Sequence, residues 1–327
     1  MKHFQEIIFD LQADTFEASA LAIFQAQAKA NQIYQKYLHL LGIRPENIRE
    51  IQEIPFLPIS FFKHHLVQTG AFCPEVVFES SRTTGQQASQ HAVRSLTHYL
   101  RACTQAFERI YGPLSQYHLL ALLPSYLERQ NASLVAMTNH FIRLTGSEYS
   151  GFYLNDFEKL RNQLQFLQKR DERKILLLGV TFALLDFAAH SPMPLGEAIV
   201  METGGMKGRG PEMIRAEVHQ ILKGAFQLNA IHSEYGMTEL MSQAYAQGGD
   251  VFEAPPWMRV YIRDLRDPFA YVETGRSGGV NIIDLANLDS CAFIATEDIG
   301  VGIGPQKFRV LGRADHSEVR GCNLMVL

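Results

Sequence analysis

The sequence predicts an α/β protein with a mostly parallel, helix-covered sheet and a β-rich subdomain toward the C-terminus. Apolar runs alternate with helical patterns between residues 75 and 226, and such alternation favours a parallel sheet covered on both faces. Beyond about residue 242, short strand-like pieces are separated by Gly, Pro, Asn and Asp. Because no linker is visible between them, we interpret residues 1–241 and 242–327 as the core and the β-rich subdomain of one domain.

The first half of the chain begins with helices. Apolar residues recur at three- and four-residue steps over residues 15–41, and Gly42 follows, which predicts one or two amphipathic helices. The apolar run at residues 75–78 predicts a strand, and a helix is expected from about residue 88 to residue 111. Residues 80–90 would then be the turn of a strand–turn–helix unit.

The same pattern continues through the rest of the chain. The predicted strands are residues 117–124, 174–179 and 197–203, with helices at 131–144 and 181–189. Pro211 is expected in the first turn of a further helix, where its missing N–H costs nothing. The predicted strands of the β-rich part are residues 258–264, 279–284, 291–296 and 307–312.

Composition and charge exclude several classes of protein. The 30 basic and 34 acidic residues give a net charge of -4, so a nucleic-acid partner is not expected. Glu6 and Asp10 interrupt the N-terminal segment, which therefore does not resemble an export signal. The longest apolar run, residues 175–185, is shorter than the ~20 residues that a membrane span requires. We expect a cytoplasmic protein without a membrane span.

The four cysteines lack C-x-x-C spacing, which disfavours a zinc site and a disulfide framework. We expect reduced thiols, with Cys73, Cys103 and Cys291 as packing residues. Cys322 lies in the segment LGRADHSEVRGCNL, residues 311–324, which also carries charged residues and glycines.

Residues 80–90, SSRTTGQQASQ, offer small hydroxyl groups and a glycine, which suit a loop that binds an anion through hydroxyl and N–H groups. A plain turn would have the same composition, and the loop contains no lysine. The strict Walker signature and the G-x-S-x-G elbow are absent, which disfavours a P-loop NTPase and an α/β-hydrolase.

A second motif is HSEYGMTEL, residues 232–240. Tyr235 could stack on a base, Thr238 could contact a phosphate, and Glu239 could hold Mg²⁺, which prefers one or two carboxylates together with substrate phosphates. The alternative is a strand-to-helix turn with a capping Thr238 and a solvated Glu239.

Three further segments carry charge beside glycine. In ATEDIGVGIG, residues 295–304, Glu297 and Asp298 precede a glycine-rich turn, where a carboxylate could accept the hydroxyls of a ribose; an acidic β-turn is the alternative. In ETGGMKGRG, residues 202–210, the side chains of Lys207 and Arg209 could compensate phosphate or carboxylate charge. A solvated loop would have the same composition and is the alternative. The last segment is LGRADHSEVRGCNL, residues 311–324.

In this order, the motifs resemble those of the adenylate-forming superfamily of acyl-CoA synthetases, adenylation domains and luciferases. SSRTTGQQA is similar to [ST]SG[ST]TGxPK, YGMTE matches YGxTE, TEDIG is similar to TGDxG, and GRADH is similar to GRxDD. More narrowly, PSYLERQNASL and the ending GRADHSEVRGCNL resemble the acyl-protein synthetase (LuxE-like) branch. The resemblance covers the chain from about residue 80 to residue 320.

This resemblance implies a function: a fatty acid reacts with ATP to form acyl-AMP, and the acyl group passes to an enzyme thiol, here matched by Cys322. A reductase or another acyl-accepting protein is the implied partner, and ATP and Mg²⁺ are the implied cofactors. Thr238 would contact the α-phosphate, Glu239 Mg²⁺, and Tyr235 the adenine. The other implied nucleotide-binding residues are Ser80, Ser81, Thr83, Thr84, Gly85, Gly204, Gly205, Asp298 and Arg313, with Lys207 and Arg209 supplying charge.

The chain also departs from the superfamily pattern. Only 12 residues follow Asp315, where superfamily members carry a lid domain with a catalytic lysine, so we expect no lid here. Arg82, Gln87 and Ala88 replace the glycine, proline and lysine of the phosphate loop, and Glu297 replaces the glycine of TGD. Three interpretations remain: an acyl-adenylate-forming synthetase, a nucleotide- or acyl-binding module without turnover, and an acyltransferase that needs no ATP.

Overall fold

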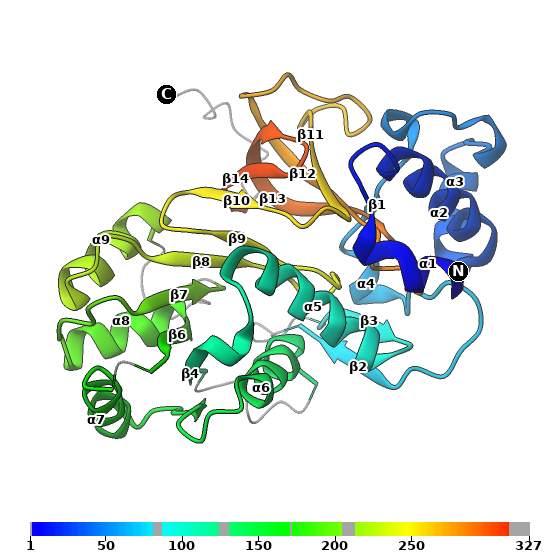
Figure 1. Ribbon diagram of the computed structural model, residues 1–327. Helices are drawn as coiled ribbons and strands as arrows, with labels where there is room; N and C mark the ends of the chain where they lie inside the picture. The colour runs from blue at the N-terminus through cyan, green and yellow to red at the C-terminus, as the bar shows by residue number, and fades with distance from the viewer. Residues whose placement is uncertain (1, 81–86, 124–130, 171, 205–212, 314–327) are drawn as a thin grey trace.

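The computed structural model describes residues 2–80, 87–123, 131–170, 172–204 and 213–313. These residues form a 12-stranded sheet with the strand order β11-β12-β13-β14-β10-β9-β8-β7-β6-β4-β5, in which β1 also pairs with β13, and a separate two-stranded sheet (Figure 1). The predicted α/β class, with a helix-covered parallel region and a β-rich C-terminal region, is confirmed.

One half of the large sheet is parallel. Its strands are β4 (Tyr117–Leu122), β5 (Gly151–Phe152), β6 (Lys174–Val180), β7 (Ile199–Thr203) and β8 (His232–Tyr235). Strands β4 and β6 are apolar along almost their whole length because both of their faces are covered. The strands predicted at residues 117–124, 174–179 and 197–203 are therefore confirmed.

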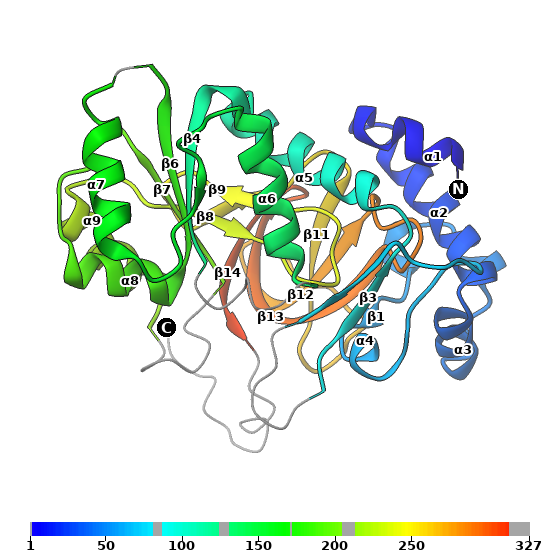
Figure 2. The same cartoon turned by 90° about the horizontal axis from the view of Figure 1, so that it is seen from below.

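Helices cover both faces of this parallel half. Helices α7 (Phe157–Leu167), α8 (Thr181–His190) and α9 (Arg215–Phe226) lie on one face, and α5 (Leu96–Tyr111) and α6 (Ser133–Thr145) lie on the other (Figure 2). The helices predicted at 131–144 and 181–189 are confirmed. Helix α9 begins at Arg215 with Ile214 as its N-cap, so the prediction that Pro211 opens it is wrong.

The other half of the sheet is antiparallel. Its strands are β9 (Ala244–Ala246), β10 (Val251–Glu253), β11 (Met258–Arg263), β12 (Ser277–Asp284), β13 (Phe293–Gly304) and β14 (Lys307–Arg313). The strand direction changes between β8 and β9. This change lies across residues 236–243, beside the boundary predicted between residues 241 and 242, which remains a prediction.

Strands β2 (Val76–Glu79) and β3 (Gln90–Val93) form a separate antiparallel hairpin. The predicted strand–turn–helix unit is therefore wrong, because the residues expected to begin a helix at about Ala88 instead form β3. Helix α5 begins later, where the Ser95 side chain accepts a hydrogen bond from the His98 N–H. Residues 80–89 thus connect two antiparallel strands rather than a strand and a helix.

The N-terminal segment packs against the C-terminal strands. It contains α1 (Lys2–Ile7), α2 (Phe16–Ala30), α3 (Gln32–Leu40), β1 (Leu57–Pro58) and α4 (Phe61–His64), together with short 3-10 turns at Ile8–Asp10, Pro45–Asn47 and Ile51–Glu53; a fourth, Leu114–Gln116, precedes β4. The helices predicted within residues 15–41 are confirmed. The buried Gln27 amide donates to Asn287 O at 2.9 Å and accepts from Ala292 N at 2.9 Å. Both contacts fix α2 to the segment between β12 and β13.

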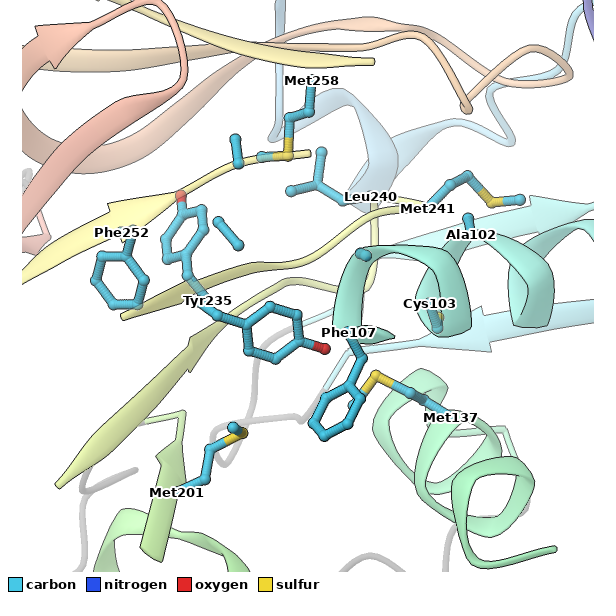
Figure 3. Close-up of a cluster of buried hydrophobic side chains, with 14 of the residues drawn as sticks. Ala102, Cys103, Phe107, Met137, Met201, Tyr235, Leu240, Met241, Phe252 and Met258 are labelled. Atoms are coloured by element: carbon cyan, nitrogen blue, oxygen red, sulfur yellow. The ribbon is translucent and has the colours of Figure 1, made fainter. Parts of the chain in front are cut away.

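The core continues beneath the end of β8. Apolar side chains of α5, α6, β7 and the segment after β8 meet there, among them Phe107, Met137, Met201 and Met241 (Figure 3).

Cys103 and Cys291 are buried as predicted, and burial raises the pKa of both thiols. Cys73 is exposed, so its predicted packing role is wrong, and Cys322 lies outside the described residues. No helix in the described ranges is long and apolar enough to cross a membrane.

Candidate active site

A tight turn follows β8 and carries Thr238 and Glu239. Leu240 N donates to Met237 O at 3.1 Å, which closes the turn on itself. The Asn287 side chain donates to Glu239 O at 2.8 Å, so a segment beyond β12 also supports the turn. The predicted turn after a strand is confirmed, but the strand β9 follows it rather than a helix.

Asp284, at the end of β12, holds the far side of this turn. Its carboxylate accepts hydrogen bonds from Met241 N at 2.8 Å, Ser242 N at 3.0 Å and Ser242 Oγ at 2.7 Å. Trp257 Nε1 donates to the same Ser242 hydroxyl at 2.8 Å. Burial raises the pKa of Asp284 although these donors favour its charged form. The parallel and antiparallel halves of the sheet are thereby fixed to one another at the turn.

The Glu239 side chain is 5% exposed. Burial raises the pKa of its carboxyl, while a hydrogen bond with the Ser89 side chain and the charges of Arg313 and Lys63 oppose the shift. Ser89 belongs to the motif at residues 80–90, so two motifs far apart in the sequence meet at this carboxylate. Glu239 is therefore not the solvated side chain of the alternative interpretation.

Ser80 and Ser89 close the base of the loop between β2 and β3. Ser80 N donates to Ser89 O at 3.0 Å, and Ser89 N donates to Ser80 Oγ at 2.9 Å. The Ser80 hydroxyl therefore accepts a bond within the loop, and its predicted contact with phosphate remains a prediction. The other predicted loop residues, Ser81, Thr83, Thr84 and Gly85, lie outside the described residues.

His91 of β3 joins the hairpin to the turn. Its Nδ1 lies 2.8 Å from Thr238 O, and its Nε2 lies 3.1 Å from Asn287 Oδ1. Because a carbonyl oxygen only accepts, Nδ1 carries a proton and donates it to Thr238 O. Burial lowers the pKa of His91. The backbone of Thr238 is thus positioned by the same strand that follows the loop.

Tyr235, Asp298 and Arg313 are also brought together. The Tyr235 hydroxyl donates to Asp298 Oδ2 at 2.7 Å, and Arg313 Nε lies 3.4 Å from Asp298 Oδ1. Burial, together with the Asp298 charge, raises the pKa of Tyr235, so its hydroxyl remains a donor. The Tyr235 ring packs against Phe252 and Phe308, with ring centroids 5.6 and 5.3 Å apart.

Asp298 lies in a bulged part of β13. Ala295 pairs with Asn281 and Ile299 pairs with Gly279, so residues 296–298 all face the single residue Val280. Such bulges re-aim side chains and are common beside active sites. The sequence interpretation of residues 295–304 as an acidic segment before a glycine-rich turn is wrong, because these residues belong to one strand.

Two side chains stabilise the bulge. Thr296 Oγ1 donates to Val280 O at 2.8 Å and accepts from Asp298 N at 3.1 Å. Arg263 Nη2 donates to Thr296 O at 2.7 Å. These bonds satisfy backbone groups that the interrupted ladder leaves without strand partners.

The end of β7 lies beside β8. Thr203 donates to the Glu234 carboxylate, and Gly204 then turns the chain with a positive φ of 82°. This left-handed conformation explains why a glycine follows Thr203. The predicted site residues Gly205, Lys207 and Arg209 lie outside the described residues.

The structure therefore brings Gly204, Tyr235, Thr238, Glu239, Asp298 and Arg313 to one region. Ser80 lies at the loop base and bonds to Ser89, which in turn bonds to Glu239. The sequence interpretation missed the residues that position them: Arg263, Asp284, Asn287 and Thr296, as well as Ser89 and His91. The only signal for Ser89 was its place within the loop motif. Within the described ranges, no three His, Cys, Asp or Glu side chains are grouped to hold a metal ion.

The family model described as "Acyl-protein synthetase, LuxE" matches residues 5–327. The chain belongs to the LuxE acyl-protein synthetase family. A curated protein of Aliivibrio fischeri, a long-chain-fatty-acid–luciferin-component ligase, is 26% identical to it over 323 residues, which is 91% of this chain and 82% of that protein. As a member of the LuxE family, the chain is an enzyme of the ligase class.

Solved structures confirm the fold. An open conformation of 2-hydroxyisobutyryl-CoA ligase, in complex with 2-HIB-AMP and CoA, is 11% identical and covers 93% of this chain and 70% of that chain, with a TM-score of 0.68. ATP-bound MatB from Rhodopseudomonas palustris is 15% identical and has a TM-score of 0.52. That match covers 72% of this chain and 47% of MatB, so the LuxE-family chain spans about half of the MatB length.

Proposed function

We propose that this LuxE-family chain activates a long-chain fatty acid with ATP and then transfers the acyl group to a thiol. The family match over residues 5–327 supports the reaction class. The observation that carries the proposal is the meeting of the Glu239 carboxylate with Ser89 at the base of the loop. It brings the proposed metal-binding and phosphate-binding segments together.

In this proposal, residues of β8 and β13 bind the nucleoside part of ATP. Asp298 is 6% exposed and already fixed by the Tyr235 hydroxyl, so its carboxylate can accept the ribose hydroxyls with little reorganisation. The backbone at Gly204 and Gly205 and the Tyr235 ring would bind the adenine. Arg313 is 76% exposed and can move from Asp298 toward the ribose.

In this proposal, the turn after β8 and the loop between β2 and β3 bind the phosphates of ATP. Thr238 would contact the α-phosphate, and Ser80, Ser81, Thr83, Thr84 and Gly85 would contact the phosphates beyond it. Glu239 fits a Mg²⁺ ion because its buried carboxylate lacks an ion-pair partner among the described side chains and accepts from a neutral hydroxyl. When bound, Mg²⁺ would neutralise charge on the phosphates.

The first chemical step joins two anions. A carboxylate oxygen of the acid forms a bond to the α-phosphorus, the bond from that phosphorus to the bridging oxygen breaks, and its electron pair leaves with pyrophosphate. The protein must therefore fix an in-line geometry and offset negative charge. Lys207 and Arg209 remain proposed contributors to this charge compensation.

In the second step, the thiolate of Cys322 attacks the acyl carbon and AMP leaves. A thiol with a pKa of ~8.5 is a few per cent ionised at neutral pH, which suffices for an activated anhydride. The acyl group would then pass to a protein partner, such as a reductase.

The core beside the turn suits a long acyl chain. Methionines 137, 201, 241 and 258 lie there, and their unbranched side chains can rearrange around a flexible ligand (Figure 3). This composition supports a fatty acid over a small polar acid.

The test is the mass of the intact protein after incubation with Mg²⁺-ATP and a panel of fatty and aryl acids. We expect an acyl adduct that requires ATP and disappears in Cys322→Ser. An adduct formed from an acyl thioester without ATP would instead establish an acyltransferase. Thermal stabilisation by AMP without any adduct or AMP release would establish a binding module, and persistence of the adduct in Cys322→Ser would exclude Cys322 as the acceptor.

A further inference from the structure

Lys63 is a cation of the site that no motif reveals. It lies in α4, and its Nζ is 3.6 Å from Glu297 Oε1, the residue next to Asp298. Its charge also favours the ionised form of Glu239. Lys63 thus lies beside a carboxylate of the bulged strand, and its charge reaches the carboxylate of the turn, although it comes from the N-terminal segment.

The position of Lys63 is fixed from two sides. Strand β1 pairs with β13 through Leu57 and Ile294, and Ile59 N donates to Ala295 O at 2.9 Å, immediately before the bulge. On the other side, Phe62 is 1% exposed and meets the His91 ring edge-on, with centroids 5.9 Å apart. Helix α4 is therefore anchored between β13 and β3, the strand that follows the phosphate loop.

The Lys63 side chain itself remains accessible. It is 34% exposed, and the Glu297 side chain is 28% exposed. An ion pair of this kind, partly open to water, is weak. A polyphosphate bound beside Glu239 can therefore attract the ammonium away from Glu297 without a large cost.

We propose that Lys63 binds the β- and γ-phosphates of ATP and compensates the charge of the departing pyrophosphate. The loop of residues 80–90 contains no lysine, and Glu297 occupies the position where the superfamily pattern has a glycine. The Lys63–Glu297 pair thus holds a cation beside the bulge, where its charge reaches Glu239. Arg313 pairs with Asp298 and serves the ribose end. This inference rests on the proposed function.

Equilibrium binding of Mg²⁺-ATP and of AMP tests the contact directly. In Lys63→Gln we expect the dissociation constant for ATP to rise about 10-fold, as for a lost charge-assisted contact, with that for AMP unchanged. Equal ATP affinities in the wild-type protein and in Lys63→Gln would overturn the proposal. A parallel loss for AMP would also overturn it, since AMP lacks the phosphates in question. Lys307→Gln is the matched control, because Lys307 also pairs with a glutamate, at 3.5 Å, but on an exposed surface.

Measurements of ATP–pyrophosphate exchange and acyl transfer then distinguish the proposed role of Lys63 from the proposed function of the chain. Lys63→Gln should lower ATP–pyrophosphate exchange about 100-fold, as removal of a transition-state donor does, while Lys63→Arg retains part of it. Acyl transfer to the protein from synthetic acyl-adenylate should be unchanged. If the wild-type protein shows no exchange with any acid, the proposed function fails, and ATP binding still decides the role of Lys63. If Glu297→Gln lowers exchange as much as Lys63→Gln does, the ion pair is structural and the phosphate contact is excluded.

Discussion

The turn after β8 and the bulge in β13 each present one buried carboxylate, but the two are held differently. Glu239 is 5% exposed and Asp298 is 6% exposed. Asp298 accepts a bond from the Tyr235 hydroxyl at 2.7 Å and pairs with Arg313. Glu239 accepts from the Ser89 hydroxyl, no described side chain forms an ion pair with it, and burial raises its pKa.

This difference separates two tasks. Asp298 is preorganised for neutral hydroxyl donors, since its charge is already compensated by protein groups. Glu239 forms no ion pair with a described side chain and lies in a desolvated place, which suits a residue that receives a cation together with its substrate. Glu239 and Asp298 should therefore respond differently to substitution.

Glu239→Gln should have the largest effect. We expect Mg²⁺-dependent pyrophosphate exchange to fall by about 1,000-fold, because the amide cannot hold the cation. Stability at pH 7 should not fall. The pKa of Glu239 is raised above 4.5 in the folded state, so its ionisation at neutral pH costs folding free energy that the amide avoids. Exchange assays and urea unfolding measure both effects, and unchanged exchange would remove Glu239 from the site.

Asp284→Ala should loosen the turn. Removal of the carboxylate leaves the buried N–H groups of Met241 and Ser242 without acceptors, at a cost of about 1–3 kcal/mol each. We therefore expect a loss of about 3 kcal/mol in the free energy of unfolding, measured by urea titration. Ser242→Ala removes one donor to the same carboxylate and the acceptor of the Trp257 indole N–H, and should cost about 2 kcal/mol. A smaller loss in Asp284→Ala than in Ser242→Ala would contradict the assigned role.

Tyr235→Phe tests the preorganisation of Asp298. Loss of the hydroxyl removes a hydrogen bond to a charged group, worth about 1.5–3 kcal/mol. We expect the KM for ATP to rise about 10-fold with little change in kcat, since the contact serves binding. An unchanged KM would show that Asp298 needs no support from β8.

The smallest expected effect is a loss of stability on mild acidification. Burial lowers the pKa values of His91, His98 and His232 below the ordinary histidine value of 6.5. At these histidines the unfolded chain binds more protons than the folded chain below pH 6.5, so their contribution to stability falls as the pH is lowered. The raised pKa values of Glu239 and Asp284 act in the opposite direction and keep the net effect small. Between pH 7.5 and 5.5 we expect a loss of about 1 kcal/mol, measured by urea unfolding. A constant midpoint would show that these histidines are protonated in the folded protein.

The parts of the fold that could be predicted are those where one local signal dominates. Strands β4 and β6 are continuous apolar runs, and α2 and α3 have clear helical periodicity. Strand β3 was missed because QHAV is short and lies directly before the strongly amphipathic α5. Ser95, as the N-cap, is the signal that separates the two elements.

In the site, too, the features with a local sequence signal could be predicted and the features without one could not. The turn that carries Thr238 and Glu239 was predicted correctly because a glycine turn after a strand is a local pattern, while the roles of both residues remain predictions. The bulge was missed because it depends on the register between β12 and β13, and a register shift leaves no mark on either sequence alone. Lys63 and His91 act through contacts with segments more than 100 residues away in the chain, which periodicity cannot predict.

The pairing of β1 with β13 has a consequence for synthesis on the ribosome. Leu57 pairs with Ile294, and Gln27 bonds to a residue 260 positions further along. Helix α2 leaves the ribosome long before its burial partners between β12 and β13 are made. Contacts of such long range form slowly, and segments that wait for them expose apolar surface. The nascent chain should therefore rely on chaperones until β13 emerges, and the active site should be assembled in the final stage of folding.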